Sequence, residues 1–131
     1  MMKPINIEER KSVWIALSEF YLDTELQDCN FNYIAMVFSE SSFSLEEIKN
    51  INKYEVFPVL QDNLLDNAGE WTGFEEEWLI TTITSKLTKR THLDNLLIDF
   101  NYSKYKWMCA DYWLAVENIY HKIRNEQQIE I

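Results

Sequence analysis

The chain has 131 residues, of which 47% are hydrophobic and 15% aromatic, and it carries a net charge of −10. This composition suits one domain with its own core and excludes the low hydrophobicity of disordered chains. No apolar run approaches the roughly 18 residues of a membrane span, and residues 1–10 contain no apolar signal segment. We therefore expect a cytoplasmic protein.

The scarcity of turn-forming residues points to helices. The chain has two glycines and two prolines, and a sheet protein of this size normally needs more of them for its turns. We expect an all-α fold: a compact single domain over residues 1–131, built as a bundle of about five to six helices. About six residues at each end should be frayed.

Two helices are predicted before residue 40. Asn6 followed by Glu9 is typical of a helix start, and apolar residues at helical spacing predict a helix from about Ile7 to Tyr21. Residues 23–30 are polar and turn-like. A second helix is predicted over residues 31–39, with three apolar side chains facing inward: Ile34, Val37 and Phe38.

The segment Ser44-Leu-Glu-Glu47 is a capping box and predicts the next helix start. Pro58 disfavours helical geometry at the residue before it. We therefore expect a break near residues 55–57 and a new helix that has Pro58 in its first turn.

Both glycines, Gly69 and Gly73, fall in one predicted turn. At least one should adopt a positive φ angle. Thr72 followed by Glu75 predicts the start of a helix that continues to about Leu87, and its end is rich in the bases that suit a helix C-terminus, namely Lys86, Lys89 and Arg90.

The C-terminal third is less clearly divided. Residues 91–103 fit either a short helix or a connecting segment. The last helix is predicted from about Lys104 to Asn125, with an apolar stripe wide enough to pack against two elements. Four tryptophans within predicted helices should lie in the core: Trp14, Trp78, Trp107 and Trp113. Trp71, in the glycine turn, fits either a plug under that turn or an exposed interface anchor.

No catalytic or cofactor motif stands out, and we expect no enzyme activity. Two glycines cannot form a phosphate-binding loop, and no nucleophile with a paired base is recognisable. Cys29 and Cys109 fit two reduced thiols. Glu117 and His121 share a helix face, but a zinc site needs further ligands, so a surface pair is the expected arrangement. We expect no metal and no cofactor.

The negative charge is concentrated in two windows that contain no Lys or Arg. Residues 12–48 hold seven acids, and residues 54–85 hold seven more. Such a field repels nucleic acid and anionic membranes and attracts basic partners. A general solubility surface would look the same. Likewise, Glu75, Glu76 and Glu77 fit either a solvated helix start, favoured by the helix dipole, or a surface that faces a partner.

Two segments, residues 13–26 and 55–79, resemble a family of small acidic helical bacterial proteins of uncharacterised function. Proteins of this type include immunity proteins, which neutralise toxins of contact-dependent inhibition and related secreted systems. The resemblance implies a cognate basic toxin domain as partner, possessing nuclease activity, bound by a monomer in a 1:1 complex. It also implies six partner-binding residues: Asp62, Asp66, Glu70, Trp71, Glu75 and Glu76.

Two other classes of function are open. A housekeeping interaction or regulatory module would have a purely structural glycine turn, and it would lack a basic partner encoded beside it. An enzyme that uses carboxylates would need acids with strongly raised pKa values in a pocket.

Overall fold

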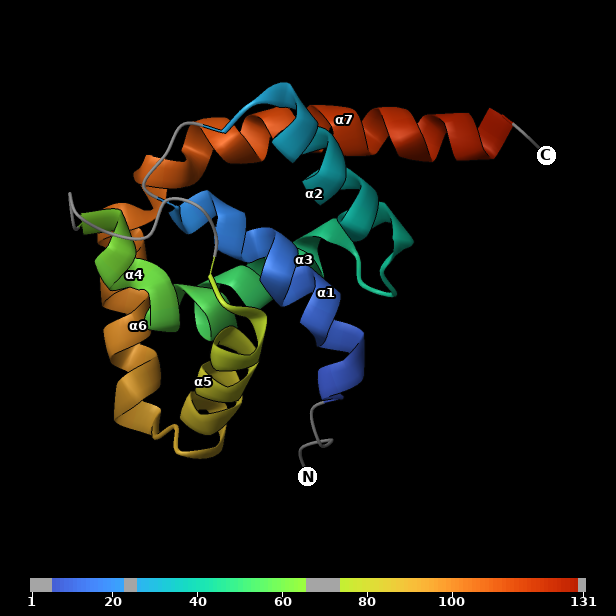
Figure 1. Ribbon diagram of the computed structural model, residues 1–131. Coiled ribbons are helices and arrows are strands. Elements are labelled where there is room, and N and C mark those ends of the chain that lie inside the picture. Colours follow the sequence, from blue (N-terminus) through green and yellow to red (C-terminus); the bar gives the residue numbers. More distant parts are fainter. Residues whose placement is uncertain (1–5, 23–25, 66–73, 130–131) are drawn as a thin grey trace.

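The structure is a computed structural model that describes residues 6–22, 26–65 and 74–129, without the side chains of residues 62–65 and 127–129. The described part is helical and contains no strand, which confirms the all-α prediction. The described residues form seven α-helices, joined in places by short helical turns (Figure 1): α1 (Ile7–Ser18), η1 (Glu19–Tyr21), α2 (Asp28–Glu40), α3 (Leu45–Ile51), η2 (Asn52–Val56), α4 (Phe57–Leu65), α5 (Glu76–Thr88), α6 (His92–Tyr105), η3 (Lys106–Cys109) and α7 (Ala110–Ile129).

Helix α1 is the centre of the core. The Asn6 side chain accepts a hydrogen bond from the Glu9 amide at 3.4 Å and caps the helix, as predicted. Val13, Trp14 and Leu17 are completely buried. The chain stays helical through η1 to Tyr21, so the predicted helix from Ile7 to Tyr21 is confirmed.

Helix α2 begins at Asp28, three residues earlier than predicted. The polar residues before Phe31 form its first turn, because the Asn30 side chain accepts a hydrogen bond from the Gln27 amide at 2.9 Å. Ile34 and Phe38 are buried as expected. Helix α2 packs against α7, where the Phe38 ring stacks on Trp113 with 5.8 Å between ring centroids.

The capping box at Ser44 is confirmed: Ser44 and Glu47 exchange hydrogen bonds of 3.1 and 2.9 Å. The chain stays helical through the break expected near residues 55–57, but a new helix, α4, begins at Phe57 with Pro58 in its first turn, as predicted. Helices α3 and α4 are joined by the π-helical turn η2, in which the Phe57 amide bonds to the Asn52 carbonyl. A π turn is wider than an α turn, so the Pro58 ring that follows is accommodated without ending the helical run.

Helix α5 begins at Glu76, and its cap is Glu75. The Glu75 carboxylate accepts hydrogen bonds from the Glu77 and Trp78 amides at 3.1 and 2.7 Å. The predicted pair had Thr72 as the cap and Glu75 three residues into the helix. This position of Glu75 is wrong, because Glu75 is itself the cap. Thr72, Gly69 and Gly73 lie outside the described residues.

Residues 91–103, left open by the sequence, belong to helix α6 and its cap. Thr91 and Asp94 form a capping box. The prediction that the last helix begins near Lys104 is wrong, because α6 continues to Tyr105 and η3 redirects the chain before α7 begins at Ala110. Helix α7 runs across the top of Figure 1, and its C-terminal end projects beyond the other helices. None of the helices in the described residues is long and apolar enough to cross a membrane.

Two of the four tryptophans predicted to be buried lie at the surface. Trp14 and Trp113 belong to the core, whereas Trp78 is 48% exposed and Trp107 is 70% exposed. Trp78 points outward and stacks on Phe74 at 6.2 Å. Trp107 lies in η3, where the change from one helix to the next breaks the apolar periodicity on which its predicted burial depended.

Candidate functional site

The predicted partner-binding residues divide into two groups. Asp66, Glu70 and Trp71 lie outside the described residues, and Asp62 lies in α4 with its side chain outside them. Glu75 and Glu76 are described, and both are exposed at the start of α5. The carboxylate of Glu75 is engaged in capping its helix, so Glu76 is the more accessible of the two for a partner.

Glu76, at the start of α5, and Glu19, in η1, both influence Tyr33 of α2 electrostatically. Burial raises the pKa of the Tyr33 hydroxyl, and the negative charges of Glu19 and Glu76 raise this pKa further. Glu19 belongs to the first base-free window and Glu76 to the second, 57 positions apart in the sequence (76 − 19). We call Glu19, Tyr33 and Glu76 the acidic surface. Tyr33 is therefore a position at which one acid from each window acts.

Glu19 has an unusual environment for a carboxylate. Its Oε2 atom is buried and, within the described residues, has no hydrogen-bond partner. Burial raises the pKa of the carboxyl group, and a hydrogen bond with the Asn30 side chain offsets part of this rise. Sequence reasoning missed Glu19 and Tyr33 as site residues. The first base-free window included Glu19. Nothing in the sequence indicated that Glu19 and Glu76 would both act on Tyr33.

Two acids, Glu55 of the second window and Glu117 outside both windows, are engaged within the protein. Glu55 points inward, where it forms an ion pair with Arg10 and accepts a hydrogen bond from the Trp14 indole. Glu117 forms an ion pair with Lys49 at 2.5 Å. The predicted partner of Glu117, His121, instead lies against the Tyr120 ring, with 5.6 Å between ring centroids. Among the described residues, no group of three His, Cys, Asp or Glu side chains could hold a metal ion.

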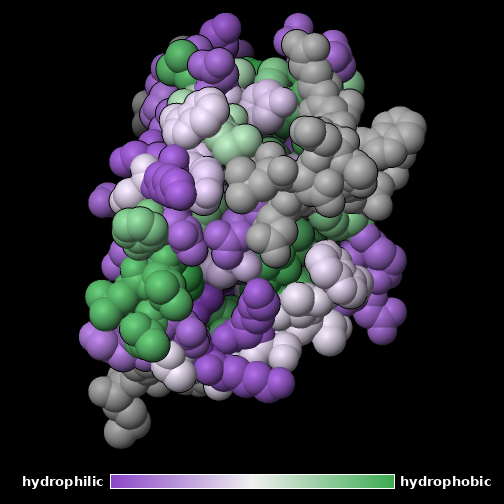
Figure 2. Space-filling model, turned by 90° about the vertical axis from the view of Figure 1, so that its left-hand side faces the viewer, coloured by the Kyte–Doolittle hydropathy of each residue, from purple (hydrophilic) through white to green (hydrophobic). Residues whose placement is uncertain are grey.

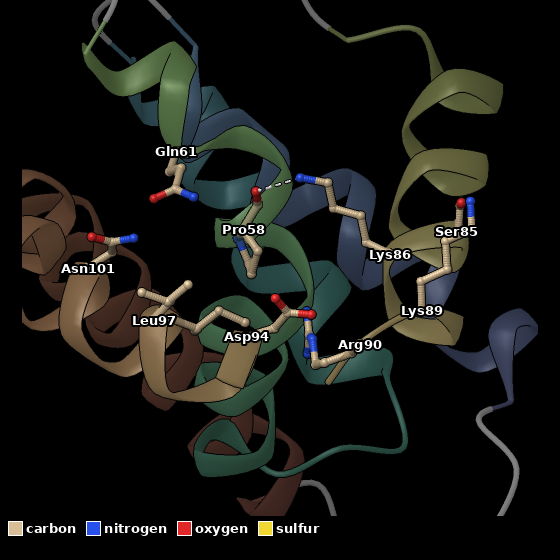
Figure 3. A pocket seen from close by; sticks show the side chains of 10 residues that line it. Pro58, Gln61, Ser85, Lys86, Lys89, Arg90, Asp94, Leu97 and Asn101 are labelled. Carbon is tan, nitrogen blue, oxygen red and sulfur yellow. Dashed lines mark hydrogen bonds between the residues drawn. The ribbon is translucent and has the colours of Figure 1, made fainter. Parts of the chain in front are cut away.

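A second surface lies at the other end of α5, where α4, α5 and α6 enclose a pocket of about 460 Å³ (Figure 3). Lys86 reaches from α5 to donate a hydrogen bond to the Pro58 carbonyl at 3.2 Å. Arg90 lies beside Asp94 of α6. Burial lowers the pKa of Arg90, and the charges of Glu55 and Asp94 raise it. Together with Lys89, this end of α5 supplies three cations to the pocket wall.

Helix α6 presents an apolar face beside this pocket. Four of its large apolar side chains are more than half exposed: Leu93 64%, Leu96 55%, Leu97 53% and Phe100 68%. Figure 2 views the side of the molecule that carries α6 and shows apolar side chains gathered there. We call these four residues the α6 apolar face. Leu97 also lines the pocket, so the apolar face and the cationic wall are continuous.

Comparison with known proteins identifies the family but no characterised relative. Residues 8–119 match the family described as a domain of unknown function, DUF7079. No curated protein and no solved structure matches the chain. The match covers most of the described helices, from α1 into α7. The chain therefore belongs to the DUF7079 family.

Proposed function

We propose that this protein is an immunity protein, which binds and neutralises a cognate secreted bacterial toxin through its acidic surface. The partner is a basic domain, and a nuclease fits best because nucleases bind phosphates through Lys and Arg clusters. Asp62, Asp66, Glu70 and Trp71 extend the same binding region in this proposal, since they precede Glu76 in the second base-free window.

The observation that carries the proposal is the pair of base-free acidic windows, because an acid from each, Glu19 and Glu76, acts electrostatically on the exposed Tyr33. Two carboxylates from separate helical segments act on one aromatic side chain, and neither has an ion pair within the described residues. Tyr33 is 43% exposed. Exposed aromatic side chains flanked by charge contribute strongly to binding at protein interfaces, and unpaired acids speed the encounter with a basic partner.

The buried Oε2 atom of Glu19 supports the same proposal. A buried oxygen without a hydrogen-bond donor costs the free protein stability. If the Glu19 side chain turned outward on binding, a Lys or Arg side chain from a partner would supply the donor and form a charge-assisted hydrogen bond, which is stronger than a neutral one. Relief of this destabilisation would then contribute favourably to the free energy of binding.

The proposal is tested by expressing the basic product of the neighbouring gene in cells with or without this chain. We expect the wild-type chain to restore growth. Glu76→Lys should lose protection, because the substitution places a positive charge toward the basic partner. Glu75 is left unchanged because it caps α5.

Glu126→Lys, near the exposed end of α7, makes the same charge change away from the acidic surface and serves as the control. Equal protection by both variants would refute a role for the acidic surface. Absence of any toxic neighbouring product would favour a housekeeping interaction module, a function compatible with the exposed α6 apolar face.

A further inference from the structure

We propose that the α6 apolar face and the adjoining pocket form a second docking site, which binds an amphipathic helix with acidic flanking residues from a partner protein. The site does not include Glu19, Tyr33 or Glu76, and the inference does not depend on the proposed neutralisation of a toxin. It rests on the exposed apolar side chains of α6 and on the positive charge of the pocket wall. It also rests on the acids of α6, which already make contacts within the protein.

The exposed residues of α6 are not needed to hold this helix in place. Its opposite side is already anchored, because Asp99 binds Lys53 at 3.0 Å and Tyr54 at 2.8 Å. On this anchored side, Ile98 is buried, and Tyr102 packs edge-on against Phe57 of the core. Large apolar patches left on the surface of a protein commonly mark binding sites.

The spacing of the α6 apolar face matches a helical partner. Leu93, Leu96, Leu97 and Phe100 stand at positions i, i+3, i+4 and i+7 of one helix. This is the spacing at which one helix presents a continuous ridge to another. An amphipathic helix could lie along this ridge and cover it with its own apolar side, as in helix-in-groove recognition.

The charge next to the ridge selects an acidic partner. Lys86, Lys89 and Arg90 line the pocket together with one acid, Asp94, and none of the three cations forms an ion pair within the described residues. This is a local concentration of positive charge on a chain whose net charge is −10. Carboxylates at the flank of a bound helix would reach these cations from the ridge, since Leu97 belongs to both the ridge and the pocket wall.

A second copy of this chain fits the site less well than an acidic partner. Two copies joined through α6 would have to neutralise these cations with the acids of the other α6. Asp99 is engaged with Lys53 and Tyr54, and Asp94 accepts a hydrogen bond of 2.9 Å from the Thr91 amide. Two copies would also repel each other through their net charges of −10.

The experiment is a selection from a displayed library of helical peptides of roughly 16 residues, about four turns, against the full chain. We expect enriched peptides to combine apolar residues at the i, i+3, i+4 spacing with flanking Asp or Glu. Their affinity should fall about tenfold or more for Leu96→Glu, and separately for Lys86→Glu/Lys89→Glu.

Two matched variants serve as controls. Met36→Glu changes an exposed apolar residue of α2, and Lys122→Glu/Arg124→Glu reverses two charges on α7. Both should bind the selected peptides as the wild type does, and circular dichroism should show that every variant is folded.

Three results would overturn the proposal. The first is that no peptide is enriched, and the second is that enriched peptides lack acids or bind the Lys86→Glu/Lys89→Glu variant unchanged. The third is that the wild type is a dimer that Leu96→Glu converts to a monomer, because a second copy would then occupy the face.

Discussion

The indole N–H of Trp14 donates a hydrogen bond of 2.8 Å to Glu55 Oε1, across 41 positions of sequence. Trp14 is completely buried in α1, and Glu55 lies in the π-helical turn between α3 and α4. The other carboxylate oxygen of Glu55 forms an ion pair with Arg10. One carboxylate therefore satisfies a buried donor and a cation, and it fixes the middle of the chain against the N-terminal helix.

Glu55→Ala should destabilise the fold by about 3 kcal/mol, because it leaves the Trp14 N–H buried without an acceptor and Arg10 without its partner. Denaturant unfolding of the purified protein measures the change. Glu46→Ala removes an exposed acid at the start of α3 and should have a much smaller effect. Equal effects of the two substitutions would mean that the Glu55 contacts contribute little to stability.

Glu19→Gln should stabilise the free protein at pH 7, by about 1 kcal/mol, because it removes the charge from a buried oxygen that has no donor among the described residues. The sign follows from the raised pKa of Glu19. The folded wild type holds this proton more tightly than the unfolded chain, so it loses stability as the pH rises from the unfolded pKa through the folded pKa.

The advantage of Glu19→Gln should therefore shrink as the pH falls from 7 towards about 4, below which Glu19 is protonated in both states. Unfolding curves at pH 7 and at low pH measure this difference. If Glu19→Gln were less stable than the wild type at pH 7, the carboxylate would have a stabilising partner, and the proposed role of its buried oxygen would be wrong.

Thr91→Ala should weaken α6 without unfolding the protein. The Thr91 side chain accepts a hydrogen bond of 3.2 Å from the Asp94 amide, and loss of such a cap costs about 1 kcal/mol. Hydrogen exchange should become faster in α6 while α1 stays protected. Ser103→Ala, an exposed position on the same helix, is the control. Unchanged exchange in α6 would show that the cap does not limit its opening.

The two cysteines should differ sharply in reactivity towards a thiol reagent. Cys29 is exposed, whereas Cys109 is buried, with its Sγ 3.7 Å from the Phe20 carbonyl oxygen. Burial raises the pKa of the Cys109 thiol to about 12, so the reactive thiolate is scarce at neutral pH. The folded protein should release one equivalent of chromophore rapidly, and Cys29→Ser should abolish this phase. Rapid modification of both thiols would show that Cys109 is accessible.

Local signals in the sequence predicted the parts of the fold that depend on neighbouring residues. The caps at Asn6 and Ser44 and the buried stripe of α1 needed only residues a few positions apart. The π-helical turn before Pro58 could not be predicted, because its stability depends on tertiary contacts such as those of Glu55 with Arg10 and Trp14.

The candidate site was less predictable than the fold. The sequence located the negative charge in two windows, but the effect of both Glu19 and Glu76 on Tyr33 depends on how η1, α2 and α5 are arranged. The exposure of Trp107 and of the α6 apolar face was missed for a related reason. Helical periodicity shows that a helix has an apolar side, but it does not show whether another element covers that side.

The most direct test of the central claim is the association rate between this chain and the basic domain encoded beside it, measured by stopped-flow fluorescence at low and high salt. Steering by the acidic surface predicts that high salt slows wild-type association by about tenfold or more, that Glu76→Lys slows it at low salt, and that Glu126→Lys has a smaller effect. A rate independent of salt and unchanged by Glu76→Lys would contradict binding through the acidic surface.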